Sequence, residues 1–211
     1  DPVLTFQLSN DFHVRKVMTN YLPNDEESKH YACLLQWDNI YYQPPTQEYL
    51  APKTTVRVGL VQWQMRTYKT LDDLFEQVEF FVDAVSDYKS DFVLFPEYFN
   101  APLMAKFNHL GEAQSIRGLA QYTEEIRERF VNLAISYNIN IITGSMPLLK
   151  EDGALYNVGY LIRRDGSYEM YEKVHVTPDE QKSWGLSGGK MGKTFDTDCA
   201  RIGGLIWYDV E

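Results

Sequence analysis

Ile206-Trp207-Tyr208-Asp209-Val210-Glu211 is the stretch that decides the fold, and its meaning depends on two charged residues far upstream. Glu97 comes just behind a short apolar run, and Lys173 comes later, in Tyr171-Glu172-Lys173-Val174-His175. Polar residues at the ends of neighbouring strands of one sheet line the same crevice. We therefore expect the charged groups of Glu97 and Lys173 to converge, directly or through one water, beside residue 207.

Apolar runs between these landmarks predict the strands of one sheet. They span residues 56–61, 91–95 and 140–144. The run at 91–95 is continuous rather than alternating, which is typical of a strand covered on both faces. Residues 156–162 and 168–171 flank the turn Arg164-Asp165-Gly166-Ser167 and predict a hairpin.

Two amphipathic helices are predicted between the strands. Thr70 has the form of an N-cap, with Asp72 and Asp73 in the first turn, where carboxylates complement the helix dipole. Apolar residues follow at helical spacing: Leu71, Leu74, Phe75, Val78, Val82 and Val85. The second helix, near Thr123–Tyr137, has its own apolar face: Ile126, Phe130, Leu133, Ala134 and Tyr137. Strand, helix, strand, helix, strand and then a hairpin indicate an α/β layered sheet with mixed strand directions.

This layout resembles the nitrilase, or carbon–nitrogen hydrolase, superfamily over residues 56–211. The shared motifs are a glutamate after a buried strand, a lysine after a hairpin, and a strand ending in an elbow that reads Cys-Tyr-Asp in the family. The resemblance implies a four-layer αββα sandwich with mixed sheets over residues 53–211, which we expect to be incomplete at its C-terminus. It also implies cleavage of a non-peptide C–N bond in a small amide or nitrile, without a cofactor. An amidase is favoured because amide hydrolysis is the commoner activity in the family.

The resemblance also implies roles for individual residues. Glu97 matches the general base, and Lys173 matches the cation beside the developing oxyanion. Glu180 matches the auxiliary glutamate that positions Lys173 and substrate, although its spacing from Lys173 is one residue short and a plain loop carboxylate is the alternative. The backbone N–H of Tyr208 would help to form the oxyanion hole. Trp207 stands where the family has its nucleophilic cysteine.

Trp207 changes the expected activity. An indole offers no nucleophilic lone pair, is much larger than a thiol, and in the same orientation would fill the pocket for the substrate carbonyl. Cys199 cannot easily replace the missing thiol, because eight residues of extended strand separate the two positions by roughly 25 Å. We therefore expect the chain to be inactive as written, whether as an inactive paralogue, a variant, or a sequence with an error at this codon.

Residues 1–52 form an N-terminal extension that differs in composition, and the pair Pro44-Pro45 favours an extended linker. Segments 11–14 and 31–37 alternate between apolar and polar residues and predict strands around a turn-rich loop. The extension weakly resembles the C-terminal tail of a GNAT-type N-acetyltransferase, and an irregular extension is the alternative. Two rival functions follow: a catalytically dead fold used for binding or assembly, and part of an acetyltransferase–nitrilase fusion.

Composition limits the classes of partner. The net charge of −10 over 211 residues argues against nucleic acid and anionic membrane surfaces. Apolar runs fall short of the roughly 20 residues that a membrane helix needs, and the N-terminus resembles no secretory signal. Cys33 and Cys199 are far apart, which favours reduced thiols in a cytoplasmic protein. We expect no metal site, since the four histidines are scattered: His13, His30, His109 and His175.

Two further expectations concern surfaces. Ser187–Thr194 is similar to a phosphate-binding loop, but Ser187 stands where that motif needs glycine. A flexible loop at the rim of the active site is the preferred interpretation, with Trp184 and Gly185 shaping a substrate entrance. We also expect a homodimer or higher oligomer, because an incomplete sandwich would expose an apolar sheet face.

Overall fold

The computed structural model describes residues 2–10, 12–19, 28–37 and 55–210. The chain divides into two compact units, residues 1–51 and 52–211. The first unit contains helix α1 (Pro2–Ser9) and the antiparallel strands β1 (Phe12–Met18) and β2 (Ala32–Trp37). The two strands confirm the alternating pattern, whereas α1 was not predicted. The predicted linker at Pro44-Pro45 lies outside the described residues.

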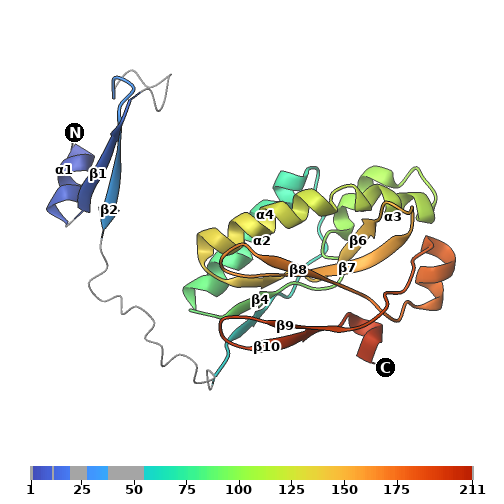
Figure 1. Ribbon diagram of the computed structural model, residues 1–211. Helices are drawn as coiled ribbons and strands as arrows, with labels where there is room; N and C mark the ends of the chain where they lie inside the picture. The colour runs from blue at the N-terminus through green and yellow to red at the C-terminus, as the bar shows by residue number, and fades with distance from the viewer. Residues whose placement is uncertain (1, 11, 20–27, 38–54, 211) are drawn as a thin grey trace. The chain divides into compact units, whose positions relative to one another are not determined.

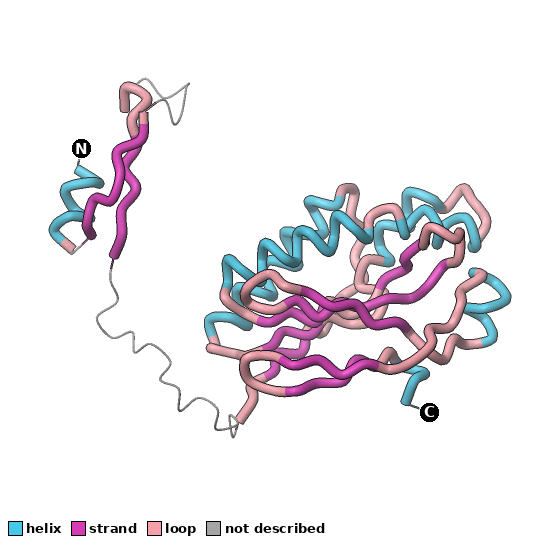
Figure 2. The backbone as a smooth tube through the Cα atoms, viewed as in Figure 1, coloured by secondary structure: helices cyan, strands magenta, loops and turns pink. Residues whose placement is uncertain are grey.

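The second unit is built on a six-stranded mixed sheet (Figures 1 and 2). Its strands are β3 (Val58–Leu60), β4 (Phe92–Leu94), β5 (Asn140–Ile142), β6 (Met146–Leu149), β7 (Leu155–Ile162) and β8 (Tyr168–Glu172). Their order is β3-β4-β5-β7-β6, and β8 pairs with β7. Pairing is parallel from β3 to β5 and antiparallel elsewhere, which confirms the expected mixed sheet and the β7–β8 hairpin.

Helices α2 (Leu71–Asp87), α3 (Glu112–Ala120) and α4 (Thr123–Tyr137) cover one face of this sheet (Figure 1). Helix α2 begins at the predicted N-cap, where Asp73 N donates to Thr70 Oγ1 at 3.1 Å and Thr70 N donates to the Asp73 carboxylate at 3.0 Å. This reciprocal capping box satisfies two N–H groups that the first helical turn leaves unpaired. Helix α4 has the predicted bounds, whereas α3, the 3-10 helix η2 (Ala101–Phe107) and strand β6 were not predicted.

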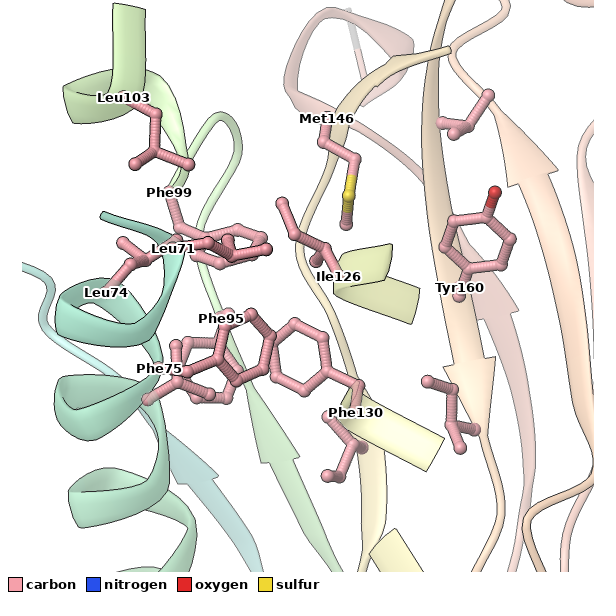
Figure 3. Close-up of a cluster of buried hydrophobic side chains, with 14 of the residues drawn as sticks. Leu71, Leu74, Phe75, Phe95, Phe99, Leu103, Ile126, Phe130, Met146 and Tyr160 are labelled. Carbon is pink, nitrogen blue, oxygen red and sulfur yellow. The ribbon is translucent and has the colours of Figure 1, made fainter. Parts of the chain in front are cut away.

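Aromatic side chains fill the space between the helices and the sheet (Figure 3). Phe130 of α4 is the centre of this cluster, with ring centroids 5.2 Å from Phe95, 5.4 Å from Phe75 and 5.6 Å from Phe99. Each edge-to-face pair adds roughly 0.5–1.5 kcal/mol beyond the burial of apolar area. Phe95 and Phe99 flank Glu97 in the sequence, so this packing fixes the segment that carries the candidate base.

A two-stranded antiparallel ribbon covers the opposite face of the sheet (Figure 1). Its strands are β9 (Lys193–Asp196) and β10 (Arg201–Gly204). Phe195 and Ile206 pack there against Phe92 and Leu161, while Val93 belongs to the helix side. The run at 91–95 is therefore covered on both faces, as predicted. The described layers are helices, sheet and ribbon, which are the first three layers of an αββα sandwich.

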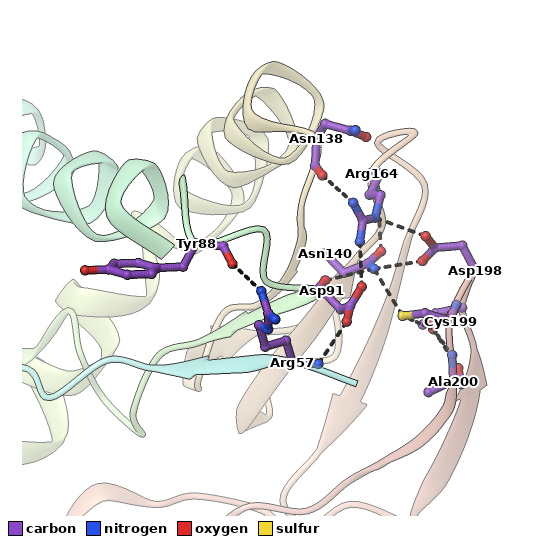
Figure 4. Close-up of polar contacts among 10 residues, drawn as sticks. Arg57, Tyr88, Asp91, Asn138, Asn140, Arg164, Asp198, Cys199 and Ala200 are labelled. Carbon is purple, nitrogen blue, oxygen red and sulfur yellow. Dashed lines mark hydrogen bonds and ion pairs between the residues drawn. The ribbon is translucent and has the colours of Figure 1, made fainter. Parts of the chain in front are cut away.

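Polar contacts attach the turn between β9 and β10 to the sheet (Figure 4). Arg164 contacts Asp91 at 3.2 Å and Asp198 at 3.0 Å, and Asn140 Nδ2 donates to Asp198 Oδ1 at 2.9 Å. The Asp91 side chain is only 4% exposed, and its carboxylate is stabilised by Arg164 and by Arg57 N, which donates to Oδ2 at 2.8 Å. The cluster fixes the ribbon at the edge of the sheet where β4 begins.

Cys199 lies in this turn, at the edge of the sheet opposite to Glu97. Strand β4 starts at Phe92, beside the polar cluster, whereas Glu97 follows the other end of the strand. Burial raises the pKa of the Cys199 thiol, which makes thiolate formation harder. Position and chemistry therefore agree with the expectation that Cys199 does not replace the missing nucleophile.

Candidate active site

The segment after β4 is held in one conformation. Glu97 forms a parallel bridge with Ser145, and Tyr98 N donates to Ser145 O at 2.8 Å. Tyr98 adopts φ +52°, a left-handed conformation that is unusual for a bulky residue and is often found at functional sites. Gly144, at φ +70°, approaches so closely that a Cβ there would lie 2.0 Å from Pro96 O. These contacts fix the backbone from which Glu97 projects.

Lys173 lies between two carboxylates. It follows β8, and its side chain is only 1% exposed. Its Nζ lies 2.9 Å from Glu97 Oε1 and 2.9 Å from Glu180 Oε1. Burial alone would lower the pKa of this ammonium, but hydrogen bonds and charge attraction from Glu180 and Glu97 outweigh burial and raise it. The predicted convergence of Glu97 and Lys173 is confirmed.

Glu180 begins a short π-helical turn, η3 (Glu180–Trp184). Its side chain is 7% exposed, with Oε1 on Lys173 and Oε2 accepting from Thr177 N at 2.7 Å. Glu180 N donates in return to Thr177 Oγ1 at 3.2 Å. The structure therefore places Glu180 against Lys173 and uses both of its carboxylate oxygens. The shortened spacing after Lys173 does not prevent the contact.

Asn157 belongs to the same group, and sequence reasoning missed it. It lies in β7, is 0% exposed, and its Nδ2 donates to Glu97 Oε1 at 2.8 Å. Its backbone O accepts from Lys173 N at 2.9 Å. The signal that was available is a single amide side chain inside the apolar run 155–162, where a buried polar residue needs a partner.

The elbow after β10 is tied to the segment that follows Lys173. The Asp209 side chain is 2% exposed, and its Oδ1 accepts from Val174 N at 2.9 Å and from His175 N at 2.7 Å. Its Oδ2 accepts from Ile206 N at 3.0 Å. A carboxylate that accepts three backbone N–H groups is a strong local anchor. Asp209 therefore brings the elbow beside Lys173.

Trp207 is oriented differently from the expectation. It begins the 3-10 turn η4 (Trp207–Val210), adopts φ +27°, and is 69% exposed. The expectation that its indole fills the substrate pocket is wrong. The turn is closed by two hydrogen bonds, from Ile206 N to Asp209 Oδ2 at 3.0 Å and from Asp209 N to Ile206 O at 3.0 Å, which fix the backbone that carries the indole. Tyr208 follows in the first turn of η4, where backbone N–H groups have no helical partner.

An aromatic pair lies beside the carboxylates. The rings of Tyr98 and Trp184 are perpendicular, with centroids 5.6 Å apart. Burial raises the pKa of the Tyr98 hydroxyl far above its ordinary value, and the carboxylates of Glu180 and Glu97 raise it further. The phenol is therefore neutral in the physiological pH range. The role of Trp184 at a substrate entrance stays a prediction.

Comparison with known proteins identifies the family. Residues 57–211 match the carbon-nitrogen hydrolase family. The chain belongs to this family. It is 42% identical over 212 residues to the probable hydrolase YhcX of Bacillus subtilis (strain 168), covering 100% of this chain and 41% of that protein. It is 31% identical over 171 residues to human omega-amidase NIT2, covering 75% of this chain and 56% of that protein.

Solved structures show the same fold. An amidase from Nesterenkonia sp. superposes with a TM-score of 0.60 at 20% identity, covering 74% of this chain and 57% of that one. A carbon-nitrogen hydrolase from Helicobacter pylori G27 gives a TM-score of 0.55 at 19% identity, covering 67% of this chain and 48% of that one. The nitrilase-like fold is therefore confirmed. The chain spans about half the length of the curated relatives it matches.

In this carbon-nitrogen hydrolase domain, the glycine-rich segment Ser187–Thr194 lies against the backbone of Lys173. Gly189 N donates to Lys173 O at 2.7 Å. A Cβ on Gly189 would lie 2.6 Å from Glu172 Cβ and 3.2 Å from Lys173 O. The segment leads into strand β9, whereas a phosphate loop leads into a helix. We expected a flexible rim, but this part of the loop is bound to the strand that carries the candidate lysine.

We expect Gly189→Ala to lower the free energy of unfolding by about 1–3 kcal/mol, because its methyl group overpacks the contact with Glu172. Gly192→Ala is the matched control, since a Cβ there meets only Leu205 Cδ2 at 3.9 Å. That control should be neutral or stabilising by about 0.4–1 kcal/mol. Urea denaturation of both variants measures the difference. Equal destabilisation would show that the close approach at Gly189 is not required.

Neither a metal cluster nor a membrane helix is found among residues 2–10, 12–19, 28–37 and 55–210. No group of three or more His, Cys, Asp or Glu side chains there could hold a metal ion. No helix in this part of the chain is long and apolar enough to span a bilayer. Both cysteines, the exposed Cys33 and the half-buried Cys199, are free.

Proposed function

We propose that residues 57–211 carry an amidase-type site for cleavage of a non-peptide C–N bond in a small amide, with a nitrile as the less favoured substrate. The observation that carries the proposal is the buried Lys173 ammonium, 2.9 Å from both Glu97 and Glu180. The relatives support an amide substrate, because one is an omega-amidase and a variant of the Nesterenkonia amidase was solved in complex with butyramide.

Hydrogen bonding distinguishes the two carboxylates. Glu180 uses one oxygen on Lys173 and the other on Thr177 N, so it holds the lysine in place. Glu97 uses only Oε1, on Lys173 and Asn157, and its Oε2 accepts no hydrogen bond from the described residues. Glu97 also keeps 19% of its side chain exposed. Glu97 is therefore the better general base, and Glu180 the better positioning group.

The reaction needs a nucleophile at position 207. A thiol there would pass its proton to Glu97, and its sulfur would form a C–S bond with the amide carbon. Lys173 and the Tyr208 N–H would stabilise the oxyanion. Glu97 would then give the proton to the departing nitrogen, so that ammonia leaves and a thioester remains for water to hydrolyse.

Trp207 supplies no such nucleophile, so we propose that the chain is inactive as written. In a variant of the Nesterenkonia amidase, the acetamide moiety of fluoroacetamide is added covalently at an active-site cysteine. The same reagent can therefore report whether a thiol at position 207 is accessible in this chain.

The test compares ammonia release from butyramide before and after Trp207→Cys in the full chain. The Trp207 protein should release none, and Trp207→Cys should gain turnover that Glu97→Gln lowers by about 10²–10⁴-fold. Fluoroacetamide should label position 207 both in Trp207→Cys and in the double variant that also carries Glu97→Gln, which shows that the new thiol is present in each. Val210→Cys is the matched control, because residue 210 is 70% exposed on the same turn and should give a labelled but inactive protein. If the Trp207 protein turns over butyramide and Glu97→Gln does not lower that rate, the active site lies elsewhere.

A second candidate function is binding or assembly. It is favoured by apolar side chains exposed at the elbow: Leu205, Trp207 and Val210 are 57%, 69% and 70% exposed. Such a surface suits a homodimer or a larger assembly. Light scattering tests this candidate, because Trp207→Ser should then lower the oligomer mass. The acetyltransferase origin of residues 1–52 stays a prediction.

A further inference from the structure

We infer that Asn157 is a positioning residue for Glu97: together with Lys173 it holds Glu97 Oε1 and leaves Oε2 as the oxygen that accepts the nucleophile's proton. This inference rests on the proposed function, since it assigns the base a fixed orientation. It adds a residue that neither the charge pattern nor the elbow motif predicts.

The position of Asn157 is set by the sheet. Its register partner on β6 is Pro147, and on the other side its backbone O accepts from Lys173 N at 2.9 Å. Asn157 therefore lies between two neighbouring strands, and its side chain meets the carboxylate that follows β4. The orientation of the amide is also determined, because a carboxylate oxygen accepts from the NH₂ group and repels the carbonyl oxygen. The 2.8 Å contact is therefore a donation from Asn157 Nδ2 to Glu97 Oε1.

The carbonyl oxygen of the Asn157 side chain makes no hydrogen bond within the described residues that would stabilise the fold. Asn157 is 0% exposed, and its Oδ1 accepts no hydrogen bond there. A buried acceptor without a partner destabilises a fold, so an apolar side chain of similar size would serve packing alone better. Ser145, the bridge partner of Glu97, is also buried, but its Oγ forms no hydrogen bond with the carboxylate or with any other described residue. Ser145 therefore provides a control that matches Asn157 in burial and proximity.

Two donors on one oxygen have a chemical consequence. Glu97 Oε1 receives both Lys173 Nζ and Asn157 Nδ2, so rotation of the carboxylate would break two bonds at once. Oε2 accepts no hydrogen bond from the described residues, so it remains available to a proton donor. Removal of the Asn157 NH₂ group should therefore disturb the orientation of the Glu97 carboxylate while the packing of the core is kept.

The experiment measures Glu97 in two independent ways. Carboxyl ¹³C NMR at fixed pH follows the chemical shift of Glu97 in the Trp207 protein, and kcat and KM of butyramide hydrolysis follow its action as the base in the Trp207→Cys protein. Asn157→Leu should change the ¹³C chemical shift of the Glu97 carboxyl, because one of the two hydrogen bonds to Oε1 is lost. It should lower kcat about tenfold and leave KM within about twofold, since the residue does not touch substrate. Ser145→Ala should change neither measurement.

The outcomes separate the two proposals. If Asn157→Leu changes the Glu97 carboxyl signal while Trp207→Cys shows no turnover, the positioning role stands and the proposed function fails. If turnover depends on Glu97 but Asn157→Leu behaves like Ser145→Ala, the positioning role is overturned. Asn157→Ala is the second variant should leucine disturb folding, because it loses the NH₂ donor and adds no charge beside Glu97. An unchanged Glu97 carboxyl signal and an unchanged kcat in that variant would also overturn the inference.

Discussion

Lys173→Met is expected to lower the free energy of unfolding by about 3–5 kcal/mol, the cost of leaving buried charges without their partner. The Lys173 side chain is 1% exposed, and its removal leaves Glu97 and Glu180 facing each other. Two carboxylates in that position repel, and neither regains full hydration, since Glu180 is only 7% exposed. Chemical denaturation followed by tryptophan fluorescence measures the change.

Lys150→Met is the matched control for this result. Its ion pair with Glu172 is partly exposed, at 31% and 20% of the two side chains, so its loss should cost about 1 kcal/mol or less. Adding Glu97→Gln and Glu180→Gln to Lys173→Met should recover part of the lost stability, because no uncompensated charge then remains. A Lys173→Met protein as stable as the Lys150→Met protein would contradict the buried ion network.

The same network has a predictable pH dependence. The pKa of Lys173 is raised in the folded state above its ordinary value of 10.5. Its stabilising contribution is therefore complete below the pKa of lysine in the unfolded chain and is lost as pH rises through the folded pKa. Unfolding free energies above about pH 10.5 should fall more steeply for the parent than for Lys173→Met.

Gly144→Ala should also destabilise strongly, by about 3–5 kcal/mol, because two costs combine at this position. Its φ is +70°, which disfavours any side chain, and its Cβ would lie 2.0 Å from Pro96 O. The neighbour is backbone, so it cannot move aside without displacing Glu97. Turnover in the Trp207→Cys protein should therefore fall along with stability.

Gly153→Ala separates the two costs. Gly153 has φ +79°, but a Cβ there meets nothing within 4 Å. It should cost only the left-handed penalty of about 1–2 kcal/mol and leave turnover unchanged. Thermal or urea unfolding of the two variants gives the comparison. Equal losses would mean that the close approach of Gly144 to Pro96 does not position Glu97, the proposed base.

The glycines of strand β10, which leads into the elbow, show how a correct sequence argument can be incomplete. The pair Gly203-Gly204 in the sequence predicts that this strand passes close to its neighbours. A Cβ on Gly204 would lie 2.6 Å from the Tyr171 ring, which confirms the expectation. A Cβ on Gly203 would meet only Lys193 O at 3.9 Å, so the same reason does not apply to it. The pattern identified the close approach, but only the packing of Tyr171 showed which glycine it requires.

Local features of this protein were determined by the sequence itself. Helices α2 and α4 follow from apolar periodicity, and the N-cap of α2 follows from Thr70 and Asp73, three residues apart. The β7–β8 hairpin follows from its turn, where Gly166 adopts φ +83°. Each of these signals depends on residues that are neighbours along the chain, so no knowledge of the fold is needed. The order of Glu97, Lys173 and the elbow likewise determined the family.

Contacts between distant segments were decided only by the tertiary structure. Asn157 and Lys173 reach Glu97 across sequence separations of 60 and 76 residues, and strand register alone brings them to one carboxylate oxygen. The outward orientation of Trp207 likewise depends on Asp209, which binds backbone N–H groups 34 and 35 residues away. A shift of one residue in the register would turn Asn157 to the opposite face of the sheet. The charged residues of the candidate site can thus be identified from the sequence, whereas the orientation of the Glu97 carboxylate depends on the assembled sheet.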